Sequence, residues 1–79
     1  MARYPMSHYI VDGDKVRDLR DRAGLSQREF ALRVATTPAN LCRIERGNGQ
    51  PRLALRTRII AALGVTLEDI CETTNALVA

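Results

Sequence analysis

Hydrophobic residues recur every three or four positions in several short stretches of this chain, a pattern typical of amphipathic helices. The first such stretch is residues 13–23, which Asp12 precedes as a helix cap. Its inward face is expected to consist of Val16, Leu19 and Ala23. A later stretch is residues 52–63. Its inward face is expected to consist of Leu55, Ile59, Ala62 and Leu63.

Two shorter helices are predicted between these stretches. The first opens with a capping box, in which Ser26 and Glu29 satisfy each other's backbone amides. The second begins at Thr37 and Pro38, since threonine caps a helix and proline at the first helical position loses no hydrogen bond. Gly47 provides its stop. The inward residues of the two helices are Phe30, Ala31, Val34, Leu41 and Ile44. Two helices joined by a four-residue corner follow the helix-turn-helix plan.

The same helix stop and start signals recur near the C-terminus. Gly64-Val65-Thr66 with Asp69 repeats the pattern of Gly24-Leu25-Ser26 with Glu29, a helix stop followed at once by a helix start. A last short helix should therefore begin after Thr66, with Leu67 and Ile70 inward. The expected fold is all-α, with five helices in one domain over residues 12–79. Residues 1–11 are expected to form an N-terminal arm, either disordered or, around Tyr9–Val11, a short strand.

With these elements in place, the chain resembles the Xre family, the phage repressor and Cro-like helix-turn-helix proteins, over residues 14–70. The resemblance implies a five-helix lambda-repressor-like domain that binds double-stranded DNA. The chain departs from the family at Pro38 and Ala39, where relatives usually carry polar residues that read bases. The residues that carry the resemblance are Leu19-Arg20, Gly24-Leu25-Ser26-Gln27, Glu29-Phe30-Ala31, Thr36-Thr37, Leu41, Ile44-Glu45-Arg46-Gly47, Pro51-Arg52 and Ala62-Leu63-Gly64-Val65.

The resemblance also implies a structural ion pair between Arg20 and Glu45. Relatives pair an arginine and a glutamate at these two positions, and both residues are present here. A buried pair would lock the first helix to the end of the second motif helix. The alternative is two separate surface charges.

If the helix that begins at Pro38 enters a major groove, its N-terminal end faces the base edges. The base-reading candidates are Pro38, Ala39, Asn40 and Arg43. Arg43 can form two hydrogen bonds to guanine, Asn40 can reach an adenine edge or a phosphate, and the other two offer apolar contact to a thymine methyl. For Arg43 the alternatives are a phosphate contact or an exposed helix charge.

Phosphate contacts are expected at helix starts and in the flanking loops, where backbone amides and side-chain donors converge. The candidates are Gln27, Arg28, Thr37, Arg46, Asn48 and Arg52. The remaining arginines of this half, Arg33, Arg56 and Arg58, are expected to be solvated, the alternative being that they extend the basic face.

Charge is unevenly distributed along the 79 residues, although the net value is only +3. Seven arginines and two glutamates lie between residues 26 and 58, whereas only acidic charges follow, at Glu68, Asp69 and Glu72. A basic half favours a polyanionic partner, since phosphate neutralisation dominates affinity for nucleic acid.

Other chemistry finds little support. Cys42 and Cys71 have no CxxC spacing and no nearby histidine, so no metal site is expected, and reduced thiols are simpler than a disulfide. His8 is the only histidine and has no candidate catalytic partner in the sequence. We therefore expect no catalytic site, no enzymatic activity and no cofactor. Without a signal peptide or an apolar run of about 20 residues, we expect a soluble cytoplasmic protein with no membrane contact.

The leading hypothesis is therefore a sequence-specific transcriptional regulator, a repressor that binds a two-fold symmetric operator as a homodimer. The alternative is an antitoxin or another module that uses this fold to bind a toxin or a different protein partner. A dimer patch is possible at Leu67, Ile70, Leu77 and Val78, or these residues close a monomeric core. Arg3 either reaches a minor groove or lies in a frayed terminus.

Overall fold

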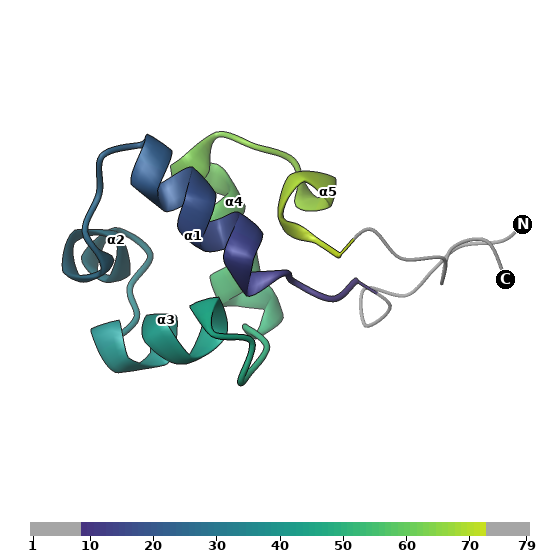
Figure 1. Ribbon diagram of the computed structural model, residues 1–79, viewed down its shortest axis with the longest axis horizontal. Coiled ribbons are helices and arrows are strands. Elements are labelled where there is room, and N and C mark those ends of the chain that lie inside the picture. Colours follow the sequence, from purple (N-terminus) through teal and green to yellow (C-terminus); the bar gives the residue numbers. More distant parts are fainter. Residues whose placement is uncertain (1–8, 73–79) are drawn as a thin grey trace, which may run out of the picture.

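The computed structural model describes residues 9–72, which contain five helices packed around one core (Figure 1). The helices are α1 (Gly13–Arg22), α2 (Gln27–Arg33), α3 (Pro38–Glu45), α4 (Leu53–Leu63) and α5 (Leu67–Ile70). Within this part of the chain, extended pairing is limited to one antiparallel bridge, between Val11 and Cys71. The all-α architecture expected from the sequence is thus confirmed. The expectations for Arg3, His8, Leu77 and Val78 fall outside the described residues.

The helix starts are those that the capping residues predict. Ser26 and Glu29 form a reciprocal capping box at α2, and Thr66 and Asp69 form another at α5. Thr37 caps α3 through its hydroxyl, with Pro38 in the first turn. These local hydrogen bonds satisfy backbone amides that have no partner inside the helix, so the sequence determines where α2, α3 and α5 begin.

The corner between α2 and α3 contains a backbone feature that the sequence does not signal. Ala35 has a φ of 59°, and it is the only non-glycine residue of the described part with a positive φ. The left-handed region costs an L-residue about 1–2 kcal/mol, and glycine is the usual occupant. Packing of the two motif helices therefore holds Ala35 in a strained conformation.

The core is made by apolar side chains from every helix together with Val11 and Cys71. Two residues expected inside it are exposed, Ala23 and Ala62. Ala23 lies beyond the last residue of α1, where it forms the C-cap. The inward face of α4 is turned away from Ala62, because its buried residues are Leu55, Arg56 and Ile59.

Arg56 is the clearest departure from expectation. It was expected to be solvated, but only 6% of its surface is exposed. The orientation of α4 that leaves Ala62 exposed also places Arg56 on the buried side. Arg58 is exposed as expected, yet its Nε donates a 2.7 Å hydrogen bond to the carbonyl of Val34, which is the C-cap of α2. The guanidinium thereby satisfies a carbonyl that α2 leaves open.

The segment before α1 joins the segment after α5. The backbone amide of Asp12 donates to Ile70, and that of Glu72 donates to Ile10. Gln50, in the loop between α3 and α4, pairs with both backbone groups of Val11, at 2.8 and 3.1 Å. The loop that follows α3 is therefore attached to the place where the segment before α1 pairs with the segment after α5.

Candidate nucleic-acid interface

Helix α3 has one side in the core and one side open to solvent. Leu41, Ile44 and Glu45 are buried, whereas the base-reading candidates point outward. Pro38, Ala39 and Arg43 are exposed and Asn40 is half-buried. No described part of the chain covers this outer face, which lies along the lower edge of the molecule in Figure 1.

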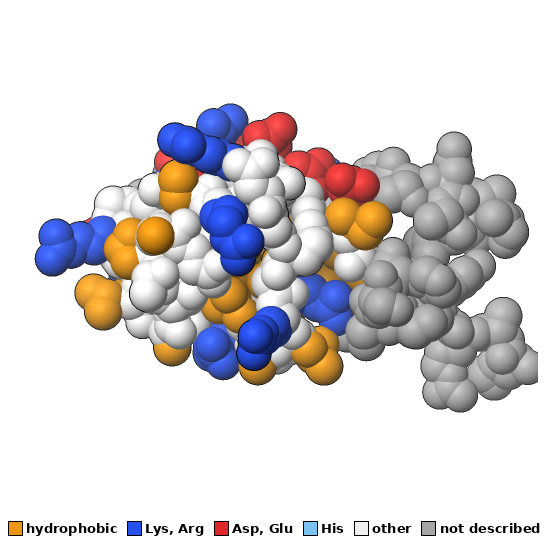
Figure 2. All heavy atoms as spheres, turned by 90° about the horizontal axis from the view of Figure 1, so that it is seen from below, with side chains coloured by type: hydrophobic (Ala, Val, Ile, Leu, Met, Phe, Trp, Pro, Cys, Tyr) orange, Lys and Arg blue, Asp and Glu red, His pale blue; other side chains and the backbone are white. Residues whose placement is uncertain are grey.

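The face that carries α3 is electrostatically one-sided. Figure 2 views the molecule from below and shows Lys and Arg side chains spread over this face, with acidic side chains gathered along one edge. Among the phosphate-contact candidates, Arg28, Arg46, Asn48 and Arg52 are all exposed. Such a surface attracts a polyanion and would release counterions on binding one.

Beneath this face, Arg20 and Glu45 form a buried ion pair, so the two residues are not separate surface charges. Arg20 Nε donates to Glu45 Oε2 at 2.7 Å and Nη2 donates to Oε1 at 3.1 Å. Arg20 Nη1 also donates to the carbonyl of Leu25. The hydrogen bonds to Glu45 are the main reason that the pKa of Arg20 is raised, although burial opposes the shift. This fork joins α1 to the C-terminal end of α3.

Gln27 belongs to the same cluster. Its Nε2 donates to Glu45 Oε1 at 2.9 Å, and the residue is half-buried. The start of α2 is thereby connected to the end of α3 through one carboxylate. A side chain held in this way presents its remaining groups at a fixed place on the surface.

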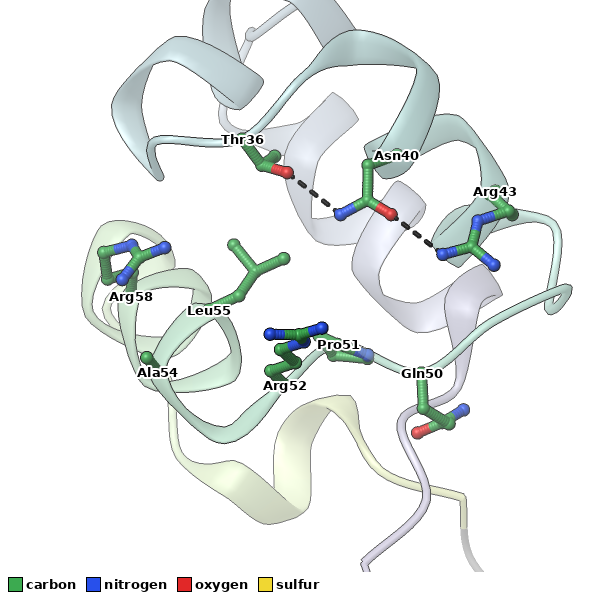
Figure 3. A pocket seen from close by; sticks show the side chains of 9 residues that line it. All are labelled: Thr36, Asn40, Arg43, Gln50, Pro51, Arg52, Ala54, Leu55 and Arg58. Carbon is green, nitrogen blue, oxygen red and sulfur yellow. Dashed lines mark hydrogen bonds between the residues drawn. The ribbon is translucent and has the colours of Figure 1, made fainter.

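The middle of α3 carries a chain of side-chain hydrogen bonds (Figure 3). Asn40 Nδ2 donates to Thr36 Oγ1 at 2.9 Å, and Asn40 Oδ1 accepts from Arg43 Nη2 at 3.1 Å. Thr37 is engaged separately, since its hydroxyl accepts from the backbone amide of Asn40. One wall of an open groove between α3 and the start of α4 is formed by Thr36, Asn40 and Arg43. The groove has a volume of about 280 Å³ and is lined by Thr36, Asn40, Arg43, Gln50, Pro51, Arg52, Ala54, Leu55 and Arg58.

Sequence reasoning missed two residues of this region, Gln50 and Gly49. Gln50 anchors the loop to Val11, and Gly49 lies against the guanidinium of Arg43, where a Cβ would stand 2.9 Å from Nη1. The composition of the loop predicts a turn, but nothing local shows which side chains the turn brings together.

Within residues 9–72, no three His, Cys, Asp or Glu side chains are grouped as a metal site would require. Cys42 and Cys71 are both free, and burial raises the pKa of the Cys71 thiol. In the same part of the chain, every helix is too short or too polar to cross a membrane.

Two short helices set at a strained corner, with the second facing solvent, define a helix-turn-helix domain. A family model for this domain matches residues 13–72, and the chain belongs to that family. The chain is 35% identical over 57 residues to the uncharacterized HTH-type transcriptional regulator YgzD of Bacillus subtilis. The aligned stretch covers 72% of this chain and 86% of the relative. An HTH-type transcriptional regulator of Methanothermobacter thermautotrophicus is 41% identical over 56 residues, 70% of this chain and 81% of the relative.

A similar solved structure is the restriction-modification controller protein C.AhdI of Aeromonas hydrophila. It superimposes with a TM-score of 0.68 at 26% identity and covers 72% of this chain and 86% of that one. The Xre-type resemblance is thus confirmed. The family and these relatives group the chain with transcriptional regulators and not with enzymes.

Proposed function

We propose that this protein is a sequence-specific double-stranded DNA-binding regulator, that it represses transcription, and that it binds a two-fold symmetric operator as a homodimer. The observation that carries the proposal is the open outer face of α3 above a buried inner face. A helix held this way fits the major groove of B-DNA, which is wide enough to admit it. The regulators to which the chain is similar support the same class of activity.

In the proposed complex the exposed outer face of α3 faces the base edges. Arg43 donates to guanine, and exposed Pro38 and Ala39 contact a thymine methyl. Phosphates are bound around this site, where a basic surface meets the helix starts and loops. The proposed phosphate contacts are Gln27, Arg28, Thr37, Arg46, Asn48 and Arg52.

A dimer follows from the size of the site. One α3 offers few side chains to the bases, so two copies on adjacent half-sites would multiply a weak affinity. Ile70 is buried in the core and Leu67 is half-buried against it, so these two residues serve the fold of one copy. The dimer contact would therefore exclude Ile70, while the exposed part of Leu67 remains open to it. A protein that binds an operator acts beside the genome, which we propose is in the cytoplasm.

Selection of bound sequences from a pool of random duplexes tests the proposal. We expect a palindromic consensus with half-sites about one helical turn apart, and an affinity that falls steeply as salt rises. A reporter promoter that contains the consensus should be silenced when the protein is present. Indifference to every duplex at low ionic strength would reject DNA binding and favour the protein-binding module.

A further inference from the structure

We propose that Asn40 and Gly49 are positioning residues that hold Arg43 against one base pair, and that Asn40 does not itself read a base. The inference rests on the proposed function, since it concerns how the same DNA face obtains its specificity. It changes the role expected for Asn40 from the sequence and gives a role to Gly49, which the sequence did not single out.

The orientation of the Asn40 amide is set by its two neighbours (Figure 3). Arg43 has donors and no acceptor, so the atom that faces Nη2 must be the carbonyl oxygen of Asn40. The NH₂ group then faces Thr36, whose hydroxyl accepts its hydrogen bond at 2.9 Å. A flipped amide would set two donors against each other and leave the contact with Arg43 repulsive.

This arrangement restricts adenine recognition by Asn40. Reading an adenine edge in the usual way requires the oxygen and the NH₂ group of one amide together. In this protein Arg43 uses one lone pair of that oxygen and Thr36 accepts one of the two N–H groups, so turning the amide toward a base would break these contacts. Arg43 remains well supplied, because its guanidinium has five N–H donors and one hydrogen bond to Asn40 leaves four.

Gly49 restricts the position of the Arg43 guanidinium from the side opposite Asn40. A Cβ built at Gly49 would lie 2.9 Å from Nη1 and 3.0 Å from Cζ of Arg43. The guanidinium thus lies between the Asn40 amide on α3 and the backbone of the following loop. The φ of Gly49 lies outside the left-handed region, so alanine is compatible with the backbone there. Its methyl group would displace the end of the arginine side chain.

Restraint of this kind adds to affinity and specificity because a long side chain loses conformational freedom when it binds. Ordering one such side chain at an interface costs about 0.5–1.5 kcal/mol, a factor of about 2 to 12 in affinity. A guanidinium already held by Asn40 and Gly49 avoids much of that loss. The saving applies only at the base that Arg43 contacts.

The test uses the full chain and duplexes that carry each of the four base pairs at every operator position. Arg43→Ala identifies the position that Arg43 reads, with an expected loss of about 5-fold to 150-fold in discrimination. Asn40→Ala and Gly49→Ala should each weaken discrimination at that same position by about 2-fold to 12-fold. Asn40→Ala should add nothing further to Arg43→Ala. The control is Arg17→Ala, an exposed residue of α1, which should change no position.

Discrimination is a ratio between duplexes, so partial unfolding of a variant, which lowers binding to all of them alike, does not change it. The inference is overturned if Asn40→Ala relaxes a different position, or if its effect adds to that of Arg43→Ala. It is also overturned if Arg43→Ala changes no position while the wild-type protein keeps a consensus, a result that leaves the proposed function standing. A wild-type protein with no base preference anywhere would reject the proposed function as well.

Discussion

Arg20 of α1 and Glu45 of α3 lie 25 residues apart in sequence and are joined by two hydrogen bonds, of 2.7 and 3.1 Å. The side chain of Arg20 is 9% exposed and that of Glu45 is 2% exposed. Because Glu45 also accepts from Gln27, one carboxylate connects the three helices that support the outer face of α3. The orientation of the proposed DNA-binding face thus depends on a charge cluster beneath it.

Breaking this pair should destabilise the fold strongly. Arg20→Ala or Glu45→Ala leaves one buried charge without its partner, and the free energy of unfolding should fall by about 3–5 kcal/mol. Urea denaturation followed by circular dichroism measures the change. Arg20→Leu with Glu45→Leu removes both charges and should cost less than the sum of the single changes. The matched control is Arg22→Ala, which breaks the exposed pair with Asp18 and should cost about 1 kcal/mol or less.

Gly13→Ala should separate α1 from α3. A Cβ at this position would lie 2.3 Å from the carbonyl oxygen of Ile44 and 2.5 Å from that of Glu45. Both atoms are backbone and cannot rotate away, so we expect a loss of about 1–3 kcal/mol in unfolding free energy, by analogy with overpacked cores. Thermal denaturation measures it, with exposed Asp14→Ala as the neighbouring control. An unchanged or raised midpoint would contradict this close approach.

Ala35→Gly should stabilise the protein. Alanine with a φ of 59° is strained, and glycine removes that strain while it adds freedom to the unfolded chain. The relief of about 1–2 kcal/mol exceeds the added entropy cost of about 0.4–1 kcal/mol, so the net gain should be about 0.5–1 kcal/mol. Urea denaturation gives the value. Ala39→Gly, in the regular helix α3, should have the opposite sign.

Stability should decline in acid partly through the two capping boxes. The backbone amide of Ser26 lowers the pKa of Glu29 below its ordinary value of 4.5, and that of Thr66 lowers the pKa of Asp69 below 3.8. A lowered pKa contributes stability that is present above the ordinary value and is lost as the pH falls through the folded value. Thermal midpoints measured between about pH 2 and pH 7 should therefore fall at the acid end. Glu29→Gln with Asp69→Asn should make that fall shallower, and an identical slope would refute the assignment.

On DNA, the two exposed arginines Arg43 and Arg52 should behave differently. Arg43→Ala should relax preference at one base position, whereas Arg52→Ala should weaken all duplexes about equally and reduce the salt dependence of binding. Binding to the consensus and to single-substitution duplexes at several salt concentrations measures both effects. If Arg52→Ala altered one base position alone, its assignment as a phosphate contact would be wrong.

The sequence by itself determined where α2, α3 and α5 begin and which face of the motif helices is buried. Ser26 with Glu29, Thr66 with Asp69, and Thr37 with Pro38 act on amides within three residues of themselves, so no distant contact is needed. The family resemblance supplied the Arg20–Glu45 pair, which spacing alone does not reveal. Local hydrogen bonding explains why the predicted starts of α2, α3 and α5 agree with the structure.

Only the tertiary structure decided the contacts between distant segments. Helix α4 buries Arg56 and leaves Ala62 exposed, because the face that a helix buries depends on its neighbours as well as on its own periodicity. The attachment of Gln50 to Val11 and the approach of Gly49 to Arg43 join segments whose sequences carry no sign of each other. Such contacts arise when packed helices bring loops together, and they determine how the outer side of α3 is held.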